Sequence, residues 1–159
     1  MAEYVLFTDS TTDLPVELVQ EMQVEVMPLV FTLGGKNYRN YPDNRELSPK
    51  EFYDRLRAGE VSTTSQINQA DFLDTFTPVL EQGKDILYLA FSSGLSGTFN
   101  SARLAAEELR EQFPERTIEV IDTLQASMGE GLAVYYAACL KNEGKSLREG
   151  ADWFVENRH

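Results

Sequence analysis

Residues 87–98 carry the pattern that decides the fold, an apolar strand that ends in a turn of serines and glycines: Leu87-Tyr88-Leu89-Ala90-Phe91-Ser92-Ser93-Gly94-Leu95-Ser96-Gly97-Thr98. A helical pattern over 98–112 follows directly. Backbone N–H groups and serine hydroxyls converge at the first turn of such a helix, where the helix dipole favours negative charge. The stretch therefore predicts a site for a carboxylate or phosphate. The alternative is a tight strand-to-helix turn in which Ser96 or Thr98 only caps the helix.

Three further polar loops lie next to predicted strands and helices. A cluster of hydroxyls, Ser62-Thr63-Thr64-Ser65-Gln66, precedes a helical pattern over 69–82. Asp9 ends an apolar strand at 3–9, and Asp122 follows another at 117–121. In a parallel sheet, ligands bind outside the carboxyl ends of the strands. We therefore expect these loops to share one edge of the sheet, although capped loops that bind nothing have the same composition.

Apolar periodicity predicts one α/β domain over residues 1–159. Strands are expected at 3–9, 24–33, 36–39, 85–91 and 117–121, with a Gly34-Gly35 turn after the second. Helices are expected at 15–22, 49–58, 69–82, 98–112, 127–142 and 147–157. Ser48 with Glu51, and Ser146 with Glu149, have the spacing of a capping box. Strands that alternate with helices predict three α/β/α layers around a mainly parallel sheet.

Composition narrows the class of partner. The chain has 14 Lys and Arg against 26 Asp and Glu, a formal net charge of −12, which repels nucleic acid. Its apolar stretches are too short to cross a bilayer, so no stable membrane insertion is expected. The N-terminal Met1-Ala2-Glu3 has no basic leader, so a cytoplasmic location is expected. Cys139 is the only cysteine, which excludes an internal disulfide and a cysteine metal cluster.

Common enzyme signatures do not fit. The turn reads Gly-Leu-Ser96-Gly rather than Gly-x-Ser-x-Gly, and His159 is the only histidine, so a serine hydrolase is excluded. Thr11 stands where an aspartyl phosphotransferase needs a second Asp. Asp9, Asp13 and Asp122 could gather around Mg²⁺, but turn and helix-start hydrogen bonds explain them better. With no phosphate-binding Gly-Lys loop either, we expect no catalytic residue, metal or cofactor.

Four motifs taken together resemble the DegV family of bacterial fatty-acid-binding proteins. They occur in the family's order over most of the chain: Asp9-Ser10-Thr11 through Pro15, Thr64-Ser65-Gln66, Ser92-Ser93-Gly94-Leu95-Ser96-Gly97-Thr98 and Ile121-Asp122-Thr123. The resemblance implies a three-layer N-terminal domain that holds a long-chain fatty acid against a second domain. Family members are longer than this chain, so we expect the second domain to be absent from it. Ile67 stands where the family usually has proline.

The resemblance also implies site residues and partners. Thr64 and Ser96 match the positions that bind the fatty-acid carboxylate, and Ser65, Ser93 and Gly97 belong to the same two motifs. Gly129 lies in a helix rich in small residues, which indicates tight packing or room for an acyl chain. Family members with a kinase partner present the acid to a separate ATP-using fatty acid kinase subunit, which forms an acyl phosphate. The chain is then a carrier rather than a catalyst.

Two other functions stay open at this stage. The family resembles the dihydroxyacetone-binding subunit of a phosphotransfer kinase, so a small polyol or ketone is a competing ligand. That subunit uses a histidine, and His159 is the only one here. A ligand-free interaction domain is the third interpretation. Lipid extraction followed by mass spectrometry separates the three.

Overall fold

The computed structural model describes residues 3–159. Its centre is a four-stranded parallel sheet with the order β2-β1-β6-β7. These strands are β1 (Tyr4–Asp9), β2 (Glu25–Met27), β6 (Asp85–Ala90) and β7 (Ile118–Asp122). The register places Leu6 beside Leu87 and Tyr88 beside Val120. The predicted parallel sheet is confirmed.

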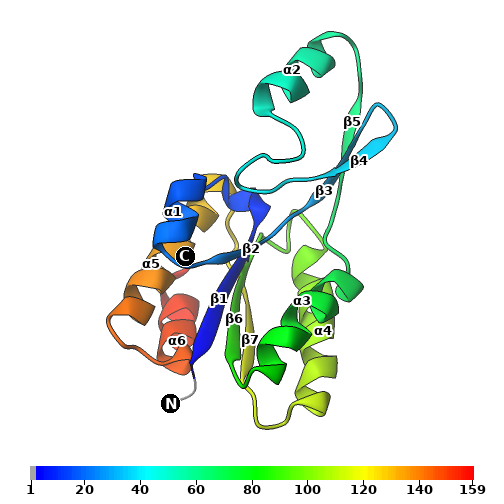
Figure 1. Cartoon of the computed structure of the whole chain (residues 1–159). Helices are drawn as coiled ribbons and strands as arrows, with labels where there is room; N and C mark the ends of the chain where they lie inside the picture. The colour runs from blue at the N-terminus through cyan, green and yellow to red at the C-terminus, as the bar shows by residue number, and fades with distance from the viewer. Residues whose placement is uncertain (1–2) are drawn as a thin grey trace.

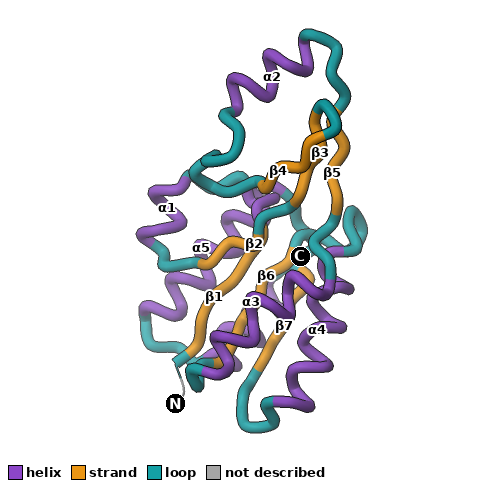
Figure 2. The backbone as a smooth tube through the Cα atoms, turned by 45° about the vertical axis from the view of Figure 1, so that its right-hand side comes forward, coloured by secondary structure: helices purple, strands orange, loops and turns teal. Residues whose placement is uncertain are grey.

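Helices cover both faces of this sheet (Figure 1). One face carries α3 (Gln69–Glu81) and α4 (Thr98–Gln112), which lie side by side in Figure 2 as well. The other face carries α1 (Val16–Glu21), α5 (Ser127–Asn142) and α6 (Leu147–Asn157). Alternation along β6 builds both cores, because Leu87 and Leu89 pack toward α5 and α6 while Ile86 and Tyr88 pack toward α3 and α4. The predicted three layers are confirmed.

A second, antiparallel sheet stands beyond the carboxyl ends of the parallel strands (Figure 1). Its order is β4-β3-β5, with β3 (Val30–Leu33), β4 (Lys36–Arg39) and β5 (Ser62–Ser65). The connection from β4 to β5 contains α2 (Pro49–Arg57), and Phe52 of α2 lies edge-on to Phe31 of β3 with ring centroids 5.4 Å apart.

Two sequence predictions need correction here. The strand expected at 24–33 divides into β2 and β3, which belong to different sheets. Pro28 stands at the break and has no N–H for a sheet ladder, and the N–H of Leu29 donates instead to Ser10 Oγ over 2.9 Å. The stretch 62–65, expected as a loop, pairs with β3 so that Thr64 lies opposite Phe31.

Of the two predicted capping boxes, the one at α6 forms in full, and the one at α2 has only the bond accepted by the Ser48 side chain. Ser146 and Glu149 form the full capping box of α6. Ser48 accepts from the N–H of Glu51 over 3.2 Å at the start of α2, with Pro49 in the first turn. Small residues of α5 serve packing, since a Cβ at Gly131 would lie 3.0 Å from Leu14 Cδ2 and 3.2 Å from the carbonyl oxygen of Thr12. No helix among residues 3–159 is long and apolar enough to cross a membrane.

Candidate ligand-binding site

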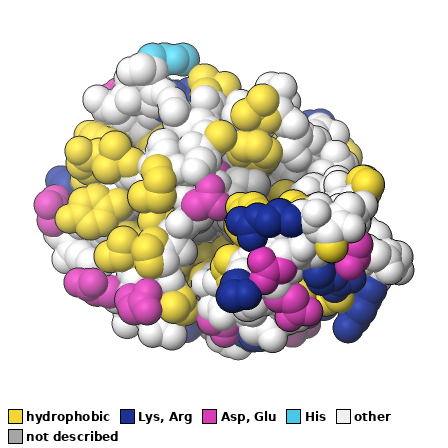
Figure 3. All heavy atoms as spheres, turned by 90° about the horizontal axis from the view of Figure 1, so that it is seen from above, with side chains coloured by type: hydrophobic (Ala, Val, Ile, Leu, Met, Phe, Trp, Pro, Cys, Tyr) yellow, Lys and Arg dark blue, Asp and Glu magenta, His cyan; other side chains and the backbone are white. Residues whose placement is uncertain are grey.

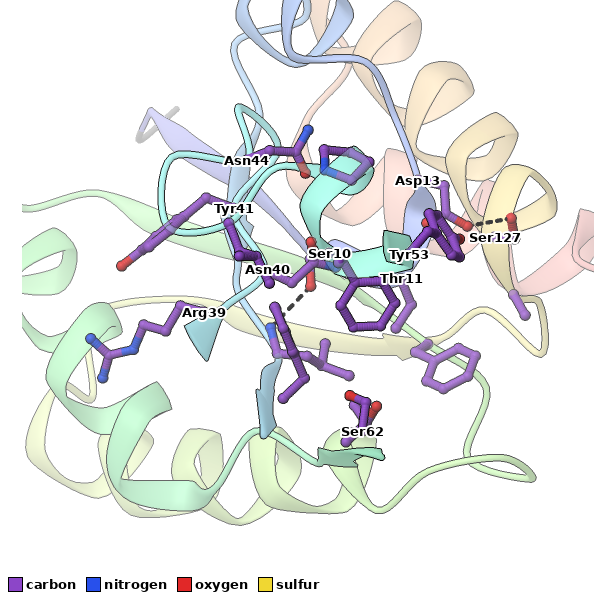
Figure 4. A pocket seen from close by; sticks show the side chains of 18 residues that line it. Ser10, Thr11, Asp13, Arg39, Asn40, Tyr41, Asn44, Tyr53, Ser62 and Ser127 are labelled. Atoms are coloured by element: carbon purple, nitrogen blue, oxygen red, sulfur yellow. Dashed lines mark hydrogen bonds between the residues drawn. The ribbon is translucent and has the colours of Figure 1, made fainter. Parts of the chain in front are cut away.

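A cavity of about 490 Å³ lies between the two sheets, at the carboxyl edge of the parallel one (Figure 4). It lies beyond the ends of β1 and β6, and β3, the β4–α2 segment, α2, β5 and the start of α5 complete its walls. Its volume falls in the range of pockets for small organic ligands. This is the edge at which the sequence predicted the site.

The lining of the cavity is amphipathic. Hydroxyl groups come from Ser10 and Thr11 after β1, from Ser62 and Thr64 of β5, and from Ser127 of α5. The apolar lining is formed largely by aromatic and aliphatic side chains: Leu29, Phe31, Leu47, Phe52, Tyr53 and Phe91. Arg39 is the one cation among the described lining residues. Such a cavity suits a ligand with an apolar body and a small polar end.

The Ser/Gly turn after β6 is held by local hydrogen bonds. Ser92 Oγ accepts from the N–H of Gly94 over 3.3 Å, and Ser96 Oγ accepts from the N–H of Thr98 over 3.2 Å. Gly97 is the N-cap residue of α4, with φ −76° and no side-chain cap. A Cβ at Gly97 would overlap the side-chain amide of Gln66, so this glycine is needed for a close approach rather than for its backbone angle.

The two predicted motifs meet at the start of α4. The N–H of Ile67 donates to Thr98 Oγ1 over 3.3 Å, and Thr98 Oγ1 lies 3.0 Å from Ser96 Oγ. Ile67 is buried in the core under α3 and α4, so an apolar contact anchors the loop where the family usually has proline. The Thr-Ser-Gln motif and the Ser/Gly turn are therefore neighbours, although they are distant in sequence.

Of the six predicted site residues, one lines the cavity and five do not. Thr64 lines it, whereas Ser65, Ser93, Ser96, Gly97 and Gly129 lie outside the set of described lining residues. Ser93 is exposed, and its N–H donates to Asp122 Oδ1 over 3.2 Å. Gly129 is exposed, and a Cβ there would lie 2.9 Å from Gln125 Oε1. A shared carboxylate contact of Thr64 and Ser96 therefore stays a prediction.

The loops after β1, β6 and β7 meet as the sequence predicted. The N–H of Ser92 donates to the carbonyl of Gln125 over 3.0 Å, and Thr123 Oγ1 donates to the carbonyl of Ala90 over 2.7 Å. Across the cavity mouth, Ser127 Oγ donates to Asp13 Oδ2 over 2.6 Å (Figure 4). These bonds join the loops that carry the candidate site to one another.

The acidic residues of these loops accept hydrogen bonds from neighbouring backbone and side-chain groups. Asp122 Oδ1 accepts from the N–H groups of Ser93 and Leu124, and Asp13 accepts from Ser127. Asp9 is fully buried and accepts from Tyr88 and Phe91. Within residues 3–159 no three acidic, histidine or cysteine side chains gather as a metal site would require.

Sequence reasoning missed one wall of the cavity. The segment from Arg39 to Asn44, together with Phe52 and Tyr53 of α2, closes the side opposite the parallel sheet. In the sequence, only the high content of aromatic residues and asparagine for a connecting loop distinguishes this segment. Glu130 was also missed, a fully buried acid in the first turn of α5.

An exposed apolar stripe runs along α5 outside the cavity. It consists of Met128, Leu132, Tyr135 and Tyr136, which are 46–55% exposed. Seen from above, hydrophobic side chains gather on the side of the molecule that holds α1 and α5, where acidic side chains border them, while most Lys and Arg side chains in this view lie on the opposite side (Figure 3). Surfaces of this kind mark contacts with other protein surfaces. Of α5, the cavity lining includes only Ser127.

Fold and cavity together define an α/β domain with a cavity at the carboxyl edge of its parallel sheet. Residues 4–159 match the family model described as "Uncharacterised protein, DegV family COG1307". The chain belongs to the DegV family.

A curated relative matches this chain in sequence, and solved structures match it in fold. A DegV domain-containing protein of Clostridium perfringens, CPE0026, is 44% identical over 100% of this chain and 54% of its own length. The structure described as fatty acid binding of a DegV family protein from Thermus thermophilus is 39% identical, with a TM-score of 0.84 over 99% of this chain and 54% of that one. DegV of Bacillus subtilis, described as a fatty acid binding protein, is 26% identical, with a TM-score of 0.85 over 99% of this chain and 54% of that one. The chain spans about half the length of the curated relatives it matches.

Proposed function

We propose that this domain binds a long-chain fatty acid, with the acyl chain in the cavity between the sheets and the carboxylate at its hydroxyl-lined end. The observation that carries the proposal is the amphipathic lining, in which Leu29, Phe31 and Phe52 form an apolar wall and Thr64 supplies a hydroxyl. The Thermus thermophilus protein, with the same fold at 39% identity, is described as binding fatty acid.

The hydrogen bonds around Ser96 support its role as a carboxylate donor. Thr98 Oγ1 accepts from Ile67, so its own hydrogen can go to Ser96 Oγ, which lies 3.0 Å away. Either hydroxyl can be the donor of this pair; when Thr98 donates, Ser96 Oγ accepts from both the hydroxyl and the N–H of Thr98. With its lone pairs used, the hydroxyl of Ser96 is left to donate outward. A hydrogen bond to a charged acceptor is among the stronger ones in proteins.

A polyol or ketone ligand is less well supported. The related dihydroxyacetone-binding subunit holds its ligand through a histidine, and here His159 is exposed at the chain end. The apolar wall of the cavity would also leave a small polyol in contact with aromatic rings. A fatty acid accounts for both the apolar wall and the hydroxyl groups of the lining.

A transfer partner forms the second part of the proposal. The family resemblance implies that a separate fatty acid kinase phosphorylates the bound carboxylate, and the chain would then act as carrier. The open mouth of the cavity beside Asp13 and Ser127 is consistent with access to the ligand from outside. Acyl phosphate formation that requires this protein, ATP and a kinase fraction together would support this part.

The test is lipid extraction and mass spectrometry of the purified protein, followed by titration with oleate. Thr64→Val and Ser96→Ala should lower oleate affinity. Thr63→Val is the matched control, because neighbouring residues of a strand point to opposite faces and Thr63 does not line the cavity. Protein that carries no lipid and binds no oleate, in the full-length context as well, would overturn the proposal.

A further inference from the structure

A pair of buried acids lies directly below the cavity floor. Asp9 ends β1 and Glu130 lies in the first turn of α5, and both side chains are 0% exposed. Thr11, which lines the cavity, stands between them. Its hydroxyl oxygen lies 2.5 Å from Asp9 Oδ1 and 2.5 Å from Glu130 Oε2. Neither acid forms an ion pair with a described lysine, arginine or histidine.

Counting hydrogens locates a proton. The hydroxyl of Thr11 has one hydrogen and can donate it to only one of the two carboxyl groups. Its other contact, also 2.5 Å, is a hydrogen bond only if that carboxyl group is itself protonated. One of the two acids therefore carries a proton.

The other neighbours identify which acid carries it. Asp9 already accepts from Tyr88 OH over 2.8 Å and from the N–H of Phe91 over 2.9 Å, and Thr11 N–H donates to it over 3.2 Å. Glu130 Oε1 has only Thr8 Oγ1, at 3.2 Å. Thr8 lies nearer, 2.9 Å, to the carbonyl of Leu89, which can only accept. Donors thus surround Asp9 and not Glu130.

Electrostatics point the same way. Burial raises the pKa of Glu130 to about 10, and the negative charge of Asp9 contributes to the shift. The titratable groups that face Glu130 are Asp9 on β1 and Tyr88 on β6. Burial, with Asp9 nearby, raises the pKa of Tyr88 as well, so its hydroxyl stays a donor to Asp9.

We propose that Glu130 is a positioning residue whose protonated carboxyl donates to Thr11, while Thr11 donates to Asp9, so that one proton ties α5 to the loop after β1. This tie adds to the bond between Ser127 and Asp13 and holds two neighbouring parts of the cavity lining, the loop after β1 and the start of α5, against each other. The proposal rests on the proposed function for its effect on fatty-acid binding. Loss of the proton would leave two negatively charged carboxylates buried beside each other. Their repulsion would separate α5 from the loop after β1.

The first experiment needs no ligand. The full chain is labelled with glutamate ¹³C-enriched at the side-chain carboxyl, and carboxyl carbon shifts are followed by NMR from pH 4 to 10, with Glu130→Gln to assign the resonance. We expect the Glu130 carbon to keep the shift of a protonated acid at pH 7, when the exposed glutamates have already titrated. Titration of Glu130 together with the exposed glutamates would overturn the proposal.

A second ligand-free measurement tests positioning. Amide hydrogen exchange is compared for wild type, Glu130→Gln, Glu130→Ala and the exposed control Glu107→Gln. The amide of glutamine keeps a donor, so Glu130→Gln should leave exchange at Thr11 and in the first turn of α5 close to wild type. Glu130→Ala should speed it at least about tenfold there, since the tie is lost. Equal exchange in both variants would contradict positioning, and if Glu130→Ala does not fold, Thr11→Val replaces it.

Oleate titration then connects the tie to binding. Oleate is kept below the concentration at which it aggregates, so that its carboxyl group stays ionised from pH 6 to 9 and a change in affinity over that range belongs to the protein. Wild type should bind oleate more weakly as the pH rises toward 9, and Glu130→Gln should not. A parallel loss in both proteins would refute the coupling. If neither wild type nor Glu130→Gln binds oleate at any pH, the proposed function fails. The NMR and exchange results still show whether Glu130 is protonated and whether it positions Thr11.

Discussion

The backbone N–H of Ile67 donates to the hydroxyl of Thr98 over 3.3 Å, and this bond joins the end of β5 to the first turn of α4. Both residues are buried. The bond brings together the Thr-Ser-Gln motif, at the end of β5 in one sheet, and the Ser/Gly turn, which follows β6 of the other sheet. Each prediction below tests a part of this arrangement or of the acids beneath it.

Replacing Thr98 by Val should destabilise the domain by about 1–3 kcal/mol, because the buried N–H of Ile67 loses its acceptor. Thr98→Ser keeps the hydroxyl and should cost less. Urea denaturation midpoints of the two variants provide the measurement. Equal midpoints would mean that the Ile67 bond contributes nothing to stability.

Replacing Ser96 by Ala separates ligand binding from helix capping. As a carboxylate donor, Ser96 contributes roughly 1.5–3 kcal/mol, so the variant should bind fatty acid about ten- to a hundredfold more weakly. As a cap only, the change would cost about 0.5–2 kcal/mol of folding free energy and leave affinity alone. Denaturation and oleate titration of the same full-length variant distinguish the outcomes. A lowered midpoint with unchanged affinity would remove Ser96 from the site.

Replacing Gly97 by Ala should be destabilising because the new Cβ overlaps the side-chain amide of Gln66, while the backbone at φ −76° accepts alanine without strain. Removing the amide with Gln66→Ala should restore the stability of Gly97→Ala. A double-mutant cycle measured by denaturation should therefore give a coupling of about 0.5–3 kcal/mol. Additive effects would show that Gln66 moves aside freely.

The free energy of unfolding should fall as the pH rises, because the pKa of Glu130 is raised in the folded protein. Its pKa is raised from 4.5 in the unfolded chain to about 10 in the folded protein. Between these values the folded state binds the extra proton, so the contribution is fully present below pH 4.5 and falls as pH rises toward 10. The slope attributable to Glu130 should be at most about 1.4 kcal/mol per pH unit.

Urea unfolding at pH 6, 7, 8 and 9 measures this slope. Glu130→Gln should flatten the profile, since glutamine does not titrate, whereas Glu107→Gln on the exposed face of α4 should keep it. The raised pKa of Glu130 would be contradicted if the stability of the wild type and of Glu107→Gln rose with pH across this interval.

Local sequence patterns were sufficient for the parallel sheet, the helices on both of its faces and the meeting of the loops after β1, β6 and β7. The continuous apolar run of β6, the hydroxyl caps of α2 and α6 and the Ser/Gly turn before α4 depend on neighbouring residues. Such signals are legible in one sequence because the physics that produces them acts over a few residues. The family resemblance, rather than these local patterns, placed Thr64 at the candidate site, and Thr64 lines the cavity.

Only the tertiary structure decided the second sheet, the wall formed by α2 and the link between Asp9 and Glu130. β5 becomes a strand because β3 offers it a partner, although its polar residues alone favour a loop. Thr11 and Glu130 are 119 residues apart in sequence, and neither is unusual by itself. The proposed proton on Glu130 depends on folding that buries Asp9 and Glu130 around the hydroxyl of Thr11, and a sequence does not display contacts at such a distance.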